Sequence, residues 1–253
     1  MAGNTVYTVT GGNRGLGLGL VKALLTRPCT TVIASVRSAE AAAGLKADEF
    51  TLGEGSLLHV ILLDFSTAPS PDNIRDALTL AAGDSIDHID VLINNAGICP
   101  PLALAAETSA EHLRLAYETN AIAPLMVFQA FWALLKKAKS SPKVIMMTSS
   151  VGSIGNQESA PGGAYGPSKA ALNWLTRALH LQNEPQGLIA VALHPGWVQT
   201  RAGKFVAKEW DYAAGPPETV EDSVKDMLRV IDGATRESLG GKFVTQRGQV
   251  LLW

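Results

Sequence analysis

The sequence predicts one α/β domain in which helices cover both faces of a doubly wound parallel sheet. Three observations support this prediction. Short apolar runs rich in β-branched residues alternate with longer segments of helical periodicity. These runs are continuously apolar, as is typical of strands that are buried on both faces. The 253 residues also contain no repeat, low-complexity tract or linker, and this length is ordinary for a single α/β domain.

The expected elements follow from these runs in chain order. Strands are predicted over residues 6–10, 31–35, 57–63, 91–94, 143–148, 189–193 and, as a last short strand, 242–244. Helices are predicted over residues 15–25, 111–135 as one long helix, 165–181 and 219–231. Residues 152–164 and 201–217 are predicted to be loops. Both are long for connections in an α/β domain, and such loops are often functional.

Composition excludes several classes of protein. Lys and Arg (21) nearly balance Asp and Glu (23), so the charge gives no reason to expect nucleic-acid binding. No apolar stretch reaches the roughly eighteen residues of a membrane span, and no secretory signal is recognisable, so we expect a cytoplasmic protein. Cys29 and Cys99 cannot form a disulfide framework or a four-ligand zinc site. The histidines show no metal-ligand spacing, so we expect no metal.

A glycine-rich turn, TGGNRGLG at residues 10–17, follows the first strand and opens the first helix. Glycines let a backbone turn sharply and approach a pyrophosphate, and the helix N-terminus offers free N–H groups and a positive dipole end. The spacing departs from the plain G-x-G-x-x-G, so a purely structural turn is the alternative. The residues expected to hold phosphates are Gly11, Asn13, Arg14, Gly15, Leu16 and Gly17.

The end of the second strand favours NADP(H) as the cofactor. An acidic residue about twenty positions after the turn would bind the ribose 2′-hydroxyl of NAD. The sequence reads Ala-Ser-Val-Arg-Ser at residues 34–38, without a carboxylate. Arg37, a neighbouring hydroxyl and Arg14 suit a 2′-phosphate instead. The alternative is that Arg37 is a solvated surface residue.

Tyr165 and Lys169 lie four residues apart and share a helix face. A free tyrosine has a pKa of about 10, too high for acid–base catalysis near neutrality. The Lys169 ammonium and the helix N-terminus both favour the phenolate, and Pro167 suits a first helical turn. The pair alone is weak evidence, because it occurs by chance in many helices.

Polar residues also end two of the predicted strands. Ser149 and Ser150 follow the fifth strand, and the run Asn94-Asn95-Ala96-Gly97 ends the fourth. In a parallel sheet, ligands bind outside the carboxyl ends of the strands. A serine hydroxyl there could bond a substrate carbonyl, and the amides and glycine could pack beside a cofactor. Turn capping is the alternative for both groups.

Together these residues resemble the short-chain dehydrogenase/reductase family over essentially the whole chain. The matching positions are the glycine turn, Asp64, residues 94–97, Asn120, Ser150, Tyr165, Lys169 and the pattern Pro195-Gly196-x-Val198-x-Thr200. The resemblance implies a Rossmann-type fold and an NADP(H)-dependent oxidoreductase that acts on C=O and CH–OH groups. It also implies a homodimer or homotetramer, associated through the helices that begin near Glu111 and Tyr165.

The resemblance also implies roles for single residues. Tyr165 donates a proton to the carbonyl, Lys169 lowers the pKa of Tyr165 and holds the nicotinamide ribose, and Ser150 orients the carbonyl, with Ser149 as the alternative. Further cofactor contacts are implied for Asp64, Phe65, Asn94, Ala96, Gly97, Pro195, Val198 and Thr200.

Asn120 has an interpretation of its own. Pro124, four residues later, lacks an N–H, so the Asn120 carbonyl loses its helical partner and could hold a water. The resemblance implies that this water joins Lys169 in a proton relay. The alternative is a simple helix kink at Pro124.

A closer resemblance is to fungal ketoreductases of the norsolorinic-acid type, which belong to secondary metabolism. Residues 4–7, 13–20, 37, 241–243 and 253 carry it, and these are scaffold and cofactor positions. The implied substrate, a small apolar or aromatic ketone or aldehyde resembling a polyketide, therefore rests on analogy. Phe205, Trp210 and Tyr212 could cover it as an apolar lid, or simply pack on the body. The alternatives to NADPH-dependent reduction are alcohol oxidation at the same site and a catalytically silent NADP(H)-binding sensor.

Overall fold

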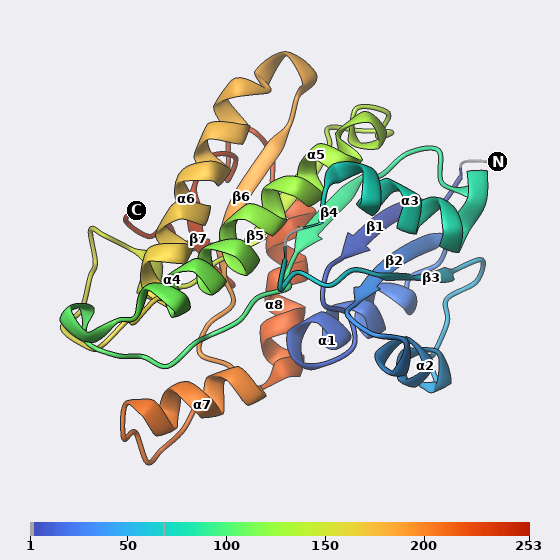
Figure 1. Ribbon diagram of the computed structural model, residues 1–253. Coiled ribbons are helices and arrows are strands. Elements are labelled where there is room, and N and C mark those ends of the chain that lie inside the picture. Colours follow the sequence, from blue (N-terminus) through green and yellow to red (C-terminus); the bar gives the residue numbers. More distant parts are fainter. Residues whose placement is uncertain (1–2, 68) are drawn as a thin grey trace.

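The computed structural model of the chain describes residues 3–67 and 69–253. Seven parallel strands form one sheet in the order β3-β2-β1-β4-β5-β6-β7, as Figure 1 shows. Their bounds are Thr5–Val9 (β1), Thr30–Val36 (β2), Leu57–Leu62 (β3), Val91–Asn94 (β4), Lys143–Met147 (β5), Ile189–His194 (β6) and Phe243–Thr245 (β7). The predicted doubly wound parallel sheet is confirmed.

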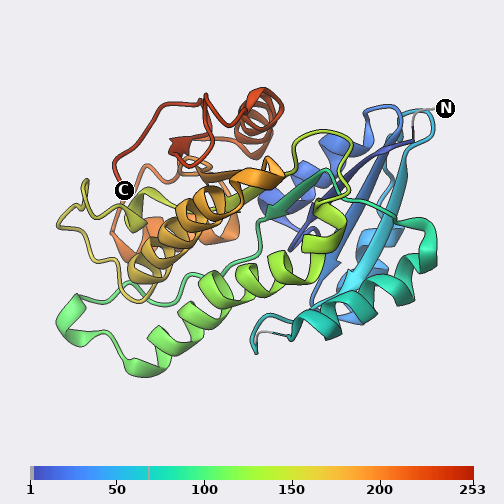
Figure 2. The ribbon, with the colours of Figure 1, turned by 90° about the horizontal axis from the view of Figure 1, so that it is seen from above.

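Helices cover both faces of this sheet. Their bounds are Gly15–Leu25 (α1), Ala39–Ala47 (α2), Pro71–Ala82 (α3), Ala110–Tyr117 (α4), Ala123–Leu135 (α5), Tyr165–Gln182 (α6), Arg201–Glu209 (α7) and Val220–Gly233 (α8). Figure 2 shows α3, the α4–α5 pair and α6 together along one side of the sheet.

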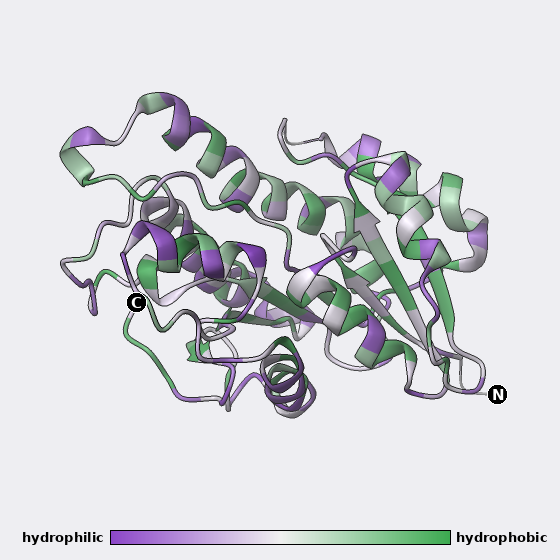
Figure 3. Cartoon of the chain, turned by 90° about the horizontal axis from the view of Figure 1, so that it is seen from below, coloured by the Kyte–Doolittle hydropathy of each residue, from purple (hydrophilic) through white to green (hydrophobic). Residues whose placement is uncertain are grey.

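Two apolar cores result from the alternation of side chains along the strands. Val9 of β1 faces one core, where α1 and α8 contribute residues such as Leu24 and Met227. Val6 faces the other core, with Phe131 of α5 and the inner residues of α3 and α6. Successive strand residues point to opposite faces, so each strand supplies both cores. In Figure 3 the strands are largely hydrophobic, whereas the helices are hydrophilic on their outer faces.

The prediction of a loop over residues 201–217 is partly wrong, because its first half is the helix α7. Thr200 caps this helix by accepting a hydrogen bond from the Gly203 N–H. The helices α2 and α3 were also missed. Ser38 and Ser70 cap them in the same way, and Pro71 occupies the first turn of α3. These three caps were visible signals in the sequence.

The long helix predicted over residues 111–135 is divided by a wider turn. A π-helical turn at Glu118–Ile122 separates α4 from α5. Pro124 lies in the first turn of α5, where it cannot supply the N–H of a regular α-helical hydrogen bond. Such π-turns are frequent at functional sites, and this one carries Asn120.

Candidate active site

One large cavity of about 2340 Å³ runs along the carboxyl edge of the sheet. It extends from the glycine turn and the end of β2 to residues 153–163 and α7. A single small-molecule pocket usually measures about 300–1,000 Å³. The cavity therefore has room for a dinucleotide and a second molecule. Apart from Asn94 and Asn120, every site residue expected from the sequence lines it.

The glycine turn has the backbone that a phosphate-binding site needs. Gly11 and Gly15 have positive φ angles of 68° and 53°. At Gly17 a Cβ would lie 2.1 Å from the Gly11 carbonyl oxygen, so only glycine fits. No described side chain caps the first turn of α1, and its N–H groups face the cavity beside Arg14. This arrangement suits the pyrophosphate of a dinucleotide.

Asn95 holds the glycine turn in place, and the sequence analysis did not assign it this role. Its Nδ2 donates to the Thr10 carbonyl at 2.8 Å. The Ala96 N–H donates to Thr10 Oγ1 at 2.9 Å. The end of β4 therefore fixes the turn that follows β1.

The side chain of Asn94, expected near a cofactor, does not line the cavity. Asn94 is 2% exposed, and its Nδ2 lies 3.3 Å from both the Pro124 carbonyl and Met146 Sδ. Its side chain is thus directed into the core toward α5. Because consecutive strand residues point to opposite faces, the amide at the cavity belongs to Asn95 instead.

Arg37 and Asp64 line the part of the cavity that lies at the ends of β2 and β3. Arg37 is exposed there between Ser35 and Ser38, which also line the cavity. Asp64 accepts a hydrogen bond from the Ser66 N–H at 2.9 Å. The Ser66 hydrogen bonds, and to a lesser extent the Arg37 charge, lower the pKa of Asp64.

Another wall of the cavity lies between the glycine turn and α7. A Cβ on Gly15 would approach Thr200 Cγ2 to 3.4 Å, so Thr200 lies directly beside the turn. Val198 and Glu218 form a parallel bridge, in which the Gln199 N–H donates to the Glu218 carbonyl at 2.8 Å. The segment from Pro195 to Thr200 is therefore fixed along the cavity wall.

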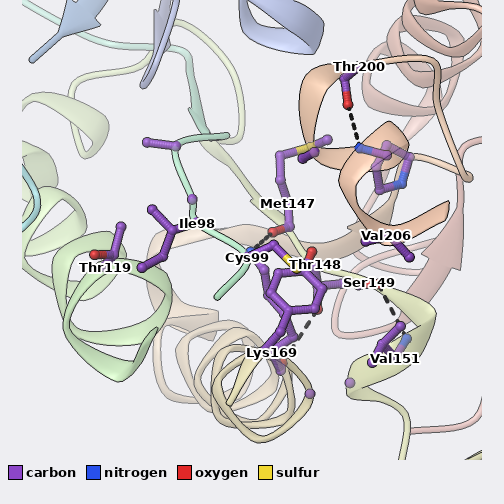
Figure 4. A pocket seen from close by; sticks show the side chains of 18 of the residues that line it. Ile98, Cys99, Thr119, Met147, Thr148, Ser149, Val151, Lys169, Thr200 and Val206 are labelled. Carbon is purple, nitrogen blue, oxygen red and sulfur yellow. Dashed lines mark hydrogen bonds between the residues drawn. The ribbon is translucent and has the colours of Figure 1, made fainter. Parts of the chain in front are cut away.

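Tyr165 and Lys169 lie on the first two turns of α6, facing the same cavity. Lys169 Nζ is 5.7 Å from the centroid of the Tyr165 ring and donates to the Met147 carbonyl at 2.7 Å. Burial lowers the pKa of Lys169 to about 8. Figure 4 shows Lys169 close to Met147, Thr148 and Cys99.

The pKa of Tyr165 is raised rather than lowered by the protein. Burial is the largest cause, Cys99 adds to it, and only the hydrogen bond with Ser149 acts in the other direction. A lowered pKa was expected from Lys169 and a bound oxidised cofactor together, and the protein's own groups by themselves raise it through burial. Tyr165 is consequently a neutral phenol at neutral pH, which is the protonation state of a proton donor.

Of the two serines, Ser149 is the one that reaches Tyr165. Ser149 is 8% exposed, lines the cavity together with Tyr165 and acts to lower the pKa of the phenol. Ser150 is exposed and begins a short 3₁₀ turn, and its N–H donates to His194 Nδ1 at 3.3 Å. The geometry therefore favours the alternative, Ser149, over Ser150 as the group that orients a carbonyl.

Asn120 lies behind the cavity wall. Its Oδ1 accepts from the Ile98 N–H and its Nδ2 donates to the Ile98 carbonyl, both at 2.9 Å. Nδ2 also bonds Ser168 Oγ at 3.0 Å, and Ser168 donates to the Tyr165 carbonyl at 2.7 Å. Asn120 and Ser168 thus join the loop after β4 to the first turn of α6. Ser168 was not found from the sequence, although it lies inside the Tyr165–Lys169 motif.

Aromatic and aliphatic side chains surround the end of the cavity at α7. Trp197 lies 5.0 Å from Tyr212 and 5.9 Å from Trp210, ring centroid to ring centroid. Trp210 Nε1 donates to the Pro161 carbonyl at 3.0 Å, and Glu209 Oε2 accepts from the Leu102 N–H at 3.0 Å. The end of α7 is therefore bonded to both walls of the cavity. Cys99 lines it as a thiol whose pKa is raised to about 12 by burial.

His194 gives the fold a pH dependence. Burial lowers its pKa from 6.5 to about 4. His194 binds a proton more readily in the unfolded chain than in the folded chain. The stability that comes from keeping His194 neutral is therefore fully present above about pH 6.5 and is lost as the pH falls toward 4. The shift amounts to at most ~3 kcal/mol. The free energy of unfolding in urea can be measured for the unmodified protein and for His194→Asn at both ends of this pH range. It should fall less on acidification in the variant than in the unmodified protein. Equal acid destabilisation of the two proteins would contradict this assignment.

The described residues contain neither a candidate membrane span nor a candidate metal cluster. No helix in the described part of the chain is long and apolar enough to span a membrane. Within residues 3–67 and 69–253, no three His, Cys, Asp or Glu side chains gather where they could hold a metal ion.

The chain is similar to known proteins over its full length. A model of the short chain dehydrogenase family matches residues 5–210. A short-chain dehydrogenase of Pyricularia oryzae is 39% identical over 263 residues, which cover 100% of both chains. A norsolorinic acid ketoreductase of Aspergillus parasiticus is 35% identical and covers 98% of this chain and 91% of that protein.

Solved structures with a similar fold include two carbonyl reductases. An NADPH-bound carbonyl reductase from chicken fatty liver has a TM-score of 0.82 and 31% identity, covering 99% of this chain and 100% of that one. The carbonyl reductase Sniffer of D. melanogaster also has a TM-score of 0.82, with 30% identity and the same coverage.

Proposed function

The chain belongs to the short-chain dehydrogenase family and is an oxidoreductase, and we propose that it reduces a ketone or aldehyde carbonyl with NADPH. One observation carries the proposal. Tyr165, a phenol, and Ser149, a hydroxyl, line the same cavity that begins at an uncapped, glycine-rich helix N-terminus. That combination can hold a dinucleotide at one end and a polarised carbonyl at the other.

The residues present suit NADPH. The N–H groups at the start of α1 would hold the pyrophosphate, Arg14 and Arg37 the 2′-phosphate, and Lys169 the nicotinamide ribose. Val198 and Thr200 would hold the carboxamide. When bound, the cofactor supplies the hydride. The protein supplies binding, orientation and the proton.

Tyr165 gives its proton to the carbonyl oxygen as negative charge develops there, and the Ser149 hydroxyl donates a hydrogen bond to the same oxygen. The buried Lys169 ammonium stabilises the tyrosinate that remains. The backbone carbonyl of Asn120 would bind a water, and this water would take part in the relay that returns a proton to Tyr165.

The substrate that fits best is neutral and apolar or aromatic, of polyketide-like size. Trp197, Phe205, Val206 and Trp210 line its end of the cavity. The similarity to norsolorinic acid ketoreductases, at 35% identity, supports the same class. The residues serve alcohol oxidation equally well, so the direction depends on the cofactor ratio. NADPH consumption with a panel of aryl and alkyl ketones tests the proposal, and a silent sensor would bind NADPH without consuming it.

Arg37→Asp should weaken NADPH binding by about 10- to 100-fold and leave NADH nearly unchanged. A hydrogen-bonded ion pair with the 2′-phosphate contributes about 1.5–3 kcal/mol, and the new carboxylate repels the phosphate. The Kd of each cofactor can be measured by nucleotide fluorescence. Arg75→Asp, which makes the same charge change on an exposed face of α3, is the matched control. An unchanged NADPH-to-NADH preference in Arg37→Asp would refute the phosphate assignment.

We also propose that the protein is a homodimer or homotetramer associated through α4, α5 and α6. Exposed apolar side chains there include Trp174 (68%) of α6 and Ile122 (40%) of the π-helical turn between α4 and α5, and exposed apolar surface can mark an association site. Light scattering should give two or four times the chain mass of 26.6 kDa, and Trp174→Glu should shift the mass toward one chain. A single-chain mass for the unmodified protein would exclude this association.

A further inference from the structure

The turn that carries Ser149 lies outside the regular sheet. Strand β5 ends at Met147, and the last sheet-like hydrogen bond beyond it is from the Thr148 N–H to the Leu193 carbonyl, at 2.9 Å. Residues 149–152, here called the serine turn, then form a short 3₁₀ turn. Something other than strand pairing must therefore fix the Ser149 hydroxyl relative to Tyr165.

The serine turn rests directly on the backbone of α6. A Cβ on Gly152 would lie 2.7 Å from Lys169 Cβ and 2.8 Å from the Lys169 carbonyl carbon. A Cβ on Gly166 would lie 3.1 Å from the Val151 carbonyl oxygen. These contacts fix how closely the turn approaches the helix, but apolar contact alone does not fix its position along the helix.

Asn173 supplies the directional bonds at this contact. It lies one helical turn after Lys169 and is 3% exposed. Its Oδ1 accepts from Thr148 Oγ1 at 2.6 Å, and its Nδ2 donates to the Gly152 carbonyl at 3.2 Å. One buried amide therefore bonds the residues at the two ends of the segment that holds Ser149.

We propose that Asn173 is a positioning residue for the proposed carbonyl reduction: by holding Thr148 and Gly152 it places the Ser149 hydroxyl against Tyr165. Asparagine suits this task because it offers an acceptor and a donor on one short planar group. Leucine of similar size would leave the Gly152 carbonyl and the Thr148 hydroxyl buried without these bonds. Aspartate would keep the acceptor and place a second oxygen against the Gly152 carbonyl.

The kinetic test is a double-mutant cycle. Asn173→Leu should lower kcat by about 10- to 100-fold, because displacement of a catalytic group by about 1 Å costs this much, while the Kd of NADPH stays unchanged. In a Ser149→Ala background, the same substitution should lower kcat by less than about 3-fold, because the positioned hydroxyl is already gone. Equal losses in both backgrounds, or no loss in either, would overturn the proposal.

Controls separate positioning from stability. Thr176→Val removes another buried α6 hydrogen bond, from Thr176 Oγ1 to the Leu172 carbonyl at 2.7 Å, and should lower Tm without lowering kcat. If Asn173→Leu does not fold, Thr148→Val removes one of the two bonds to Asn173 and should show the same dependence on Ser149.

Hydrogen exchange tests the positioning separately from the reaction. Amides of residues 149–153 should exchange faster in Asn173→Leu, whereas those of the β5 and β6 strands should not. Unchanged exchange in the serine turn would overturn the role of Asn173. Faster exchange in a protein that consumes no NADPH with any ketone would retain that role and reject the proposed function.

Discussion

Replacing Tyr165 with phenylalanine should lower kcat for ketone reduction by about 10²- to 10⁴-fold, the usual contribution of a general acid. The substitution removes the phenol hydroxyl and keeps the ring in the cavity wall. NADPH binding should be preserved, because the glycine turn and Arg37 are untouched. Steady-state NADPH oxidation and NADPH fluorescence measure the two quantities.

Tyr117→Phe is the matched control, since Tyr117 also lines the cavity but lies at the end of α4. It should retain activity within a few-fold of the unmodified protein, as expected for a hydroxyl that takes no part in the reaction. Turnover by Tyr165→Phe at the unmodified rate would reject Tyr165 as the proton donor. Tight NADPH binding without turnover, in the unmodified protein as well as in Tyr165→Phe, would favour the sensor alternative.

Much of the fold could be predicted because its elements have strong local signals. The strands are continuously apolar, and the glycine turn marks the start of α1. By contrast, α2 and α3 bury few apolar residues, Leu45 in one and Ile74 and Leu78 in the other, so their periodicity is weak. The helix α7 was not expected because Gly203 lies within it and Gly215, Pro216 and Pro217 follow it, although Thr200 is an ordinary cap.

Two differences between the expected site and the structure have one physical origin. Asn94 was chosen where Asn95 faces the cavity, and Ser150 was preferred where Ser149 contacts Tyr165. Both pairs stand at the ends of strands, where successive side chains point to opposite sides and a shift by one residue reverses the direction. A motif locates such residues along the chain but does not give the direction of each side chain.

The pKa of Tyr165 differs from expectation for another reason. The four-residue spacing correctly places Lys169 near the ring, at 5.7 Å from its centroid. Burial acts on both groups at once, raising the pKa of Tyr165 and lowering that of Lys169. Desolvation depends on all the groups that surround a side chain. The spacing of two residues in the sequence gives no information about those groups.

The two serines offer the sharpest comparison. Ser149→Ala should lower kcat by about 10²- to 10³-fold, as removal of one hydrogen-bond donor to a developing oxyanion does. Ser150→Ala should change kcat by only about 2-fold, since the exposed hydroxyl is lost while the backbone N–H still donates to His194. The substitutions have the same size and chemistry and lie at adjacent positions, so each is the control for the other.

Single-turnover rates with saturating NADPH and an aryl ketone would measure both effects without a contribution from product release. A large loss in Ser149→Ala with near-normal rates in Ser150→Ala would assign the carbonyl to Ser149. The opposite result would mean that the serine turn rearranges when substrate binds, because only then could the exposed Ser150 hydroxyl reach the oxygen that Tyr165 protonates. Equal losses in both variants would indicate that the geometry of the whole turn, rather than one hydroxyl, controls the rate.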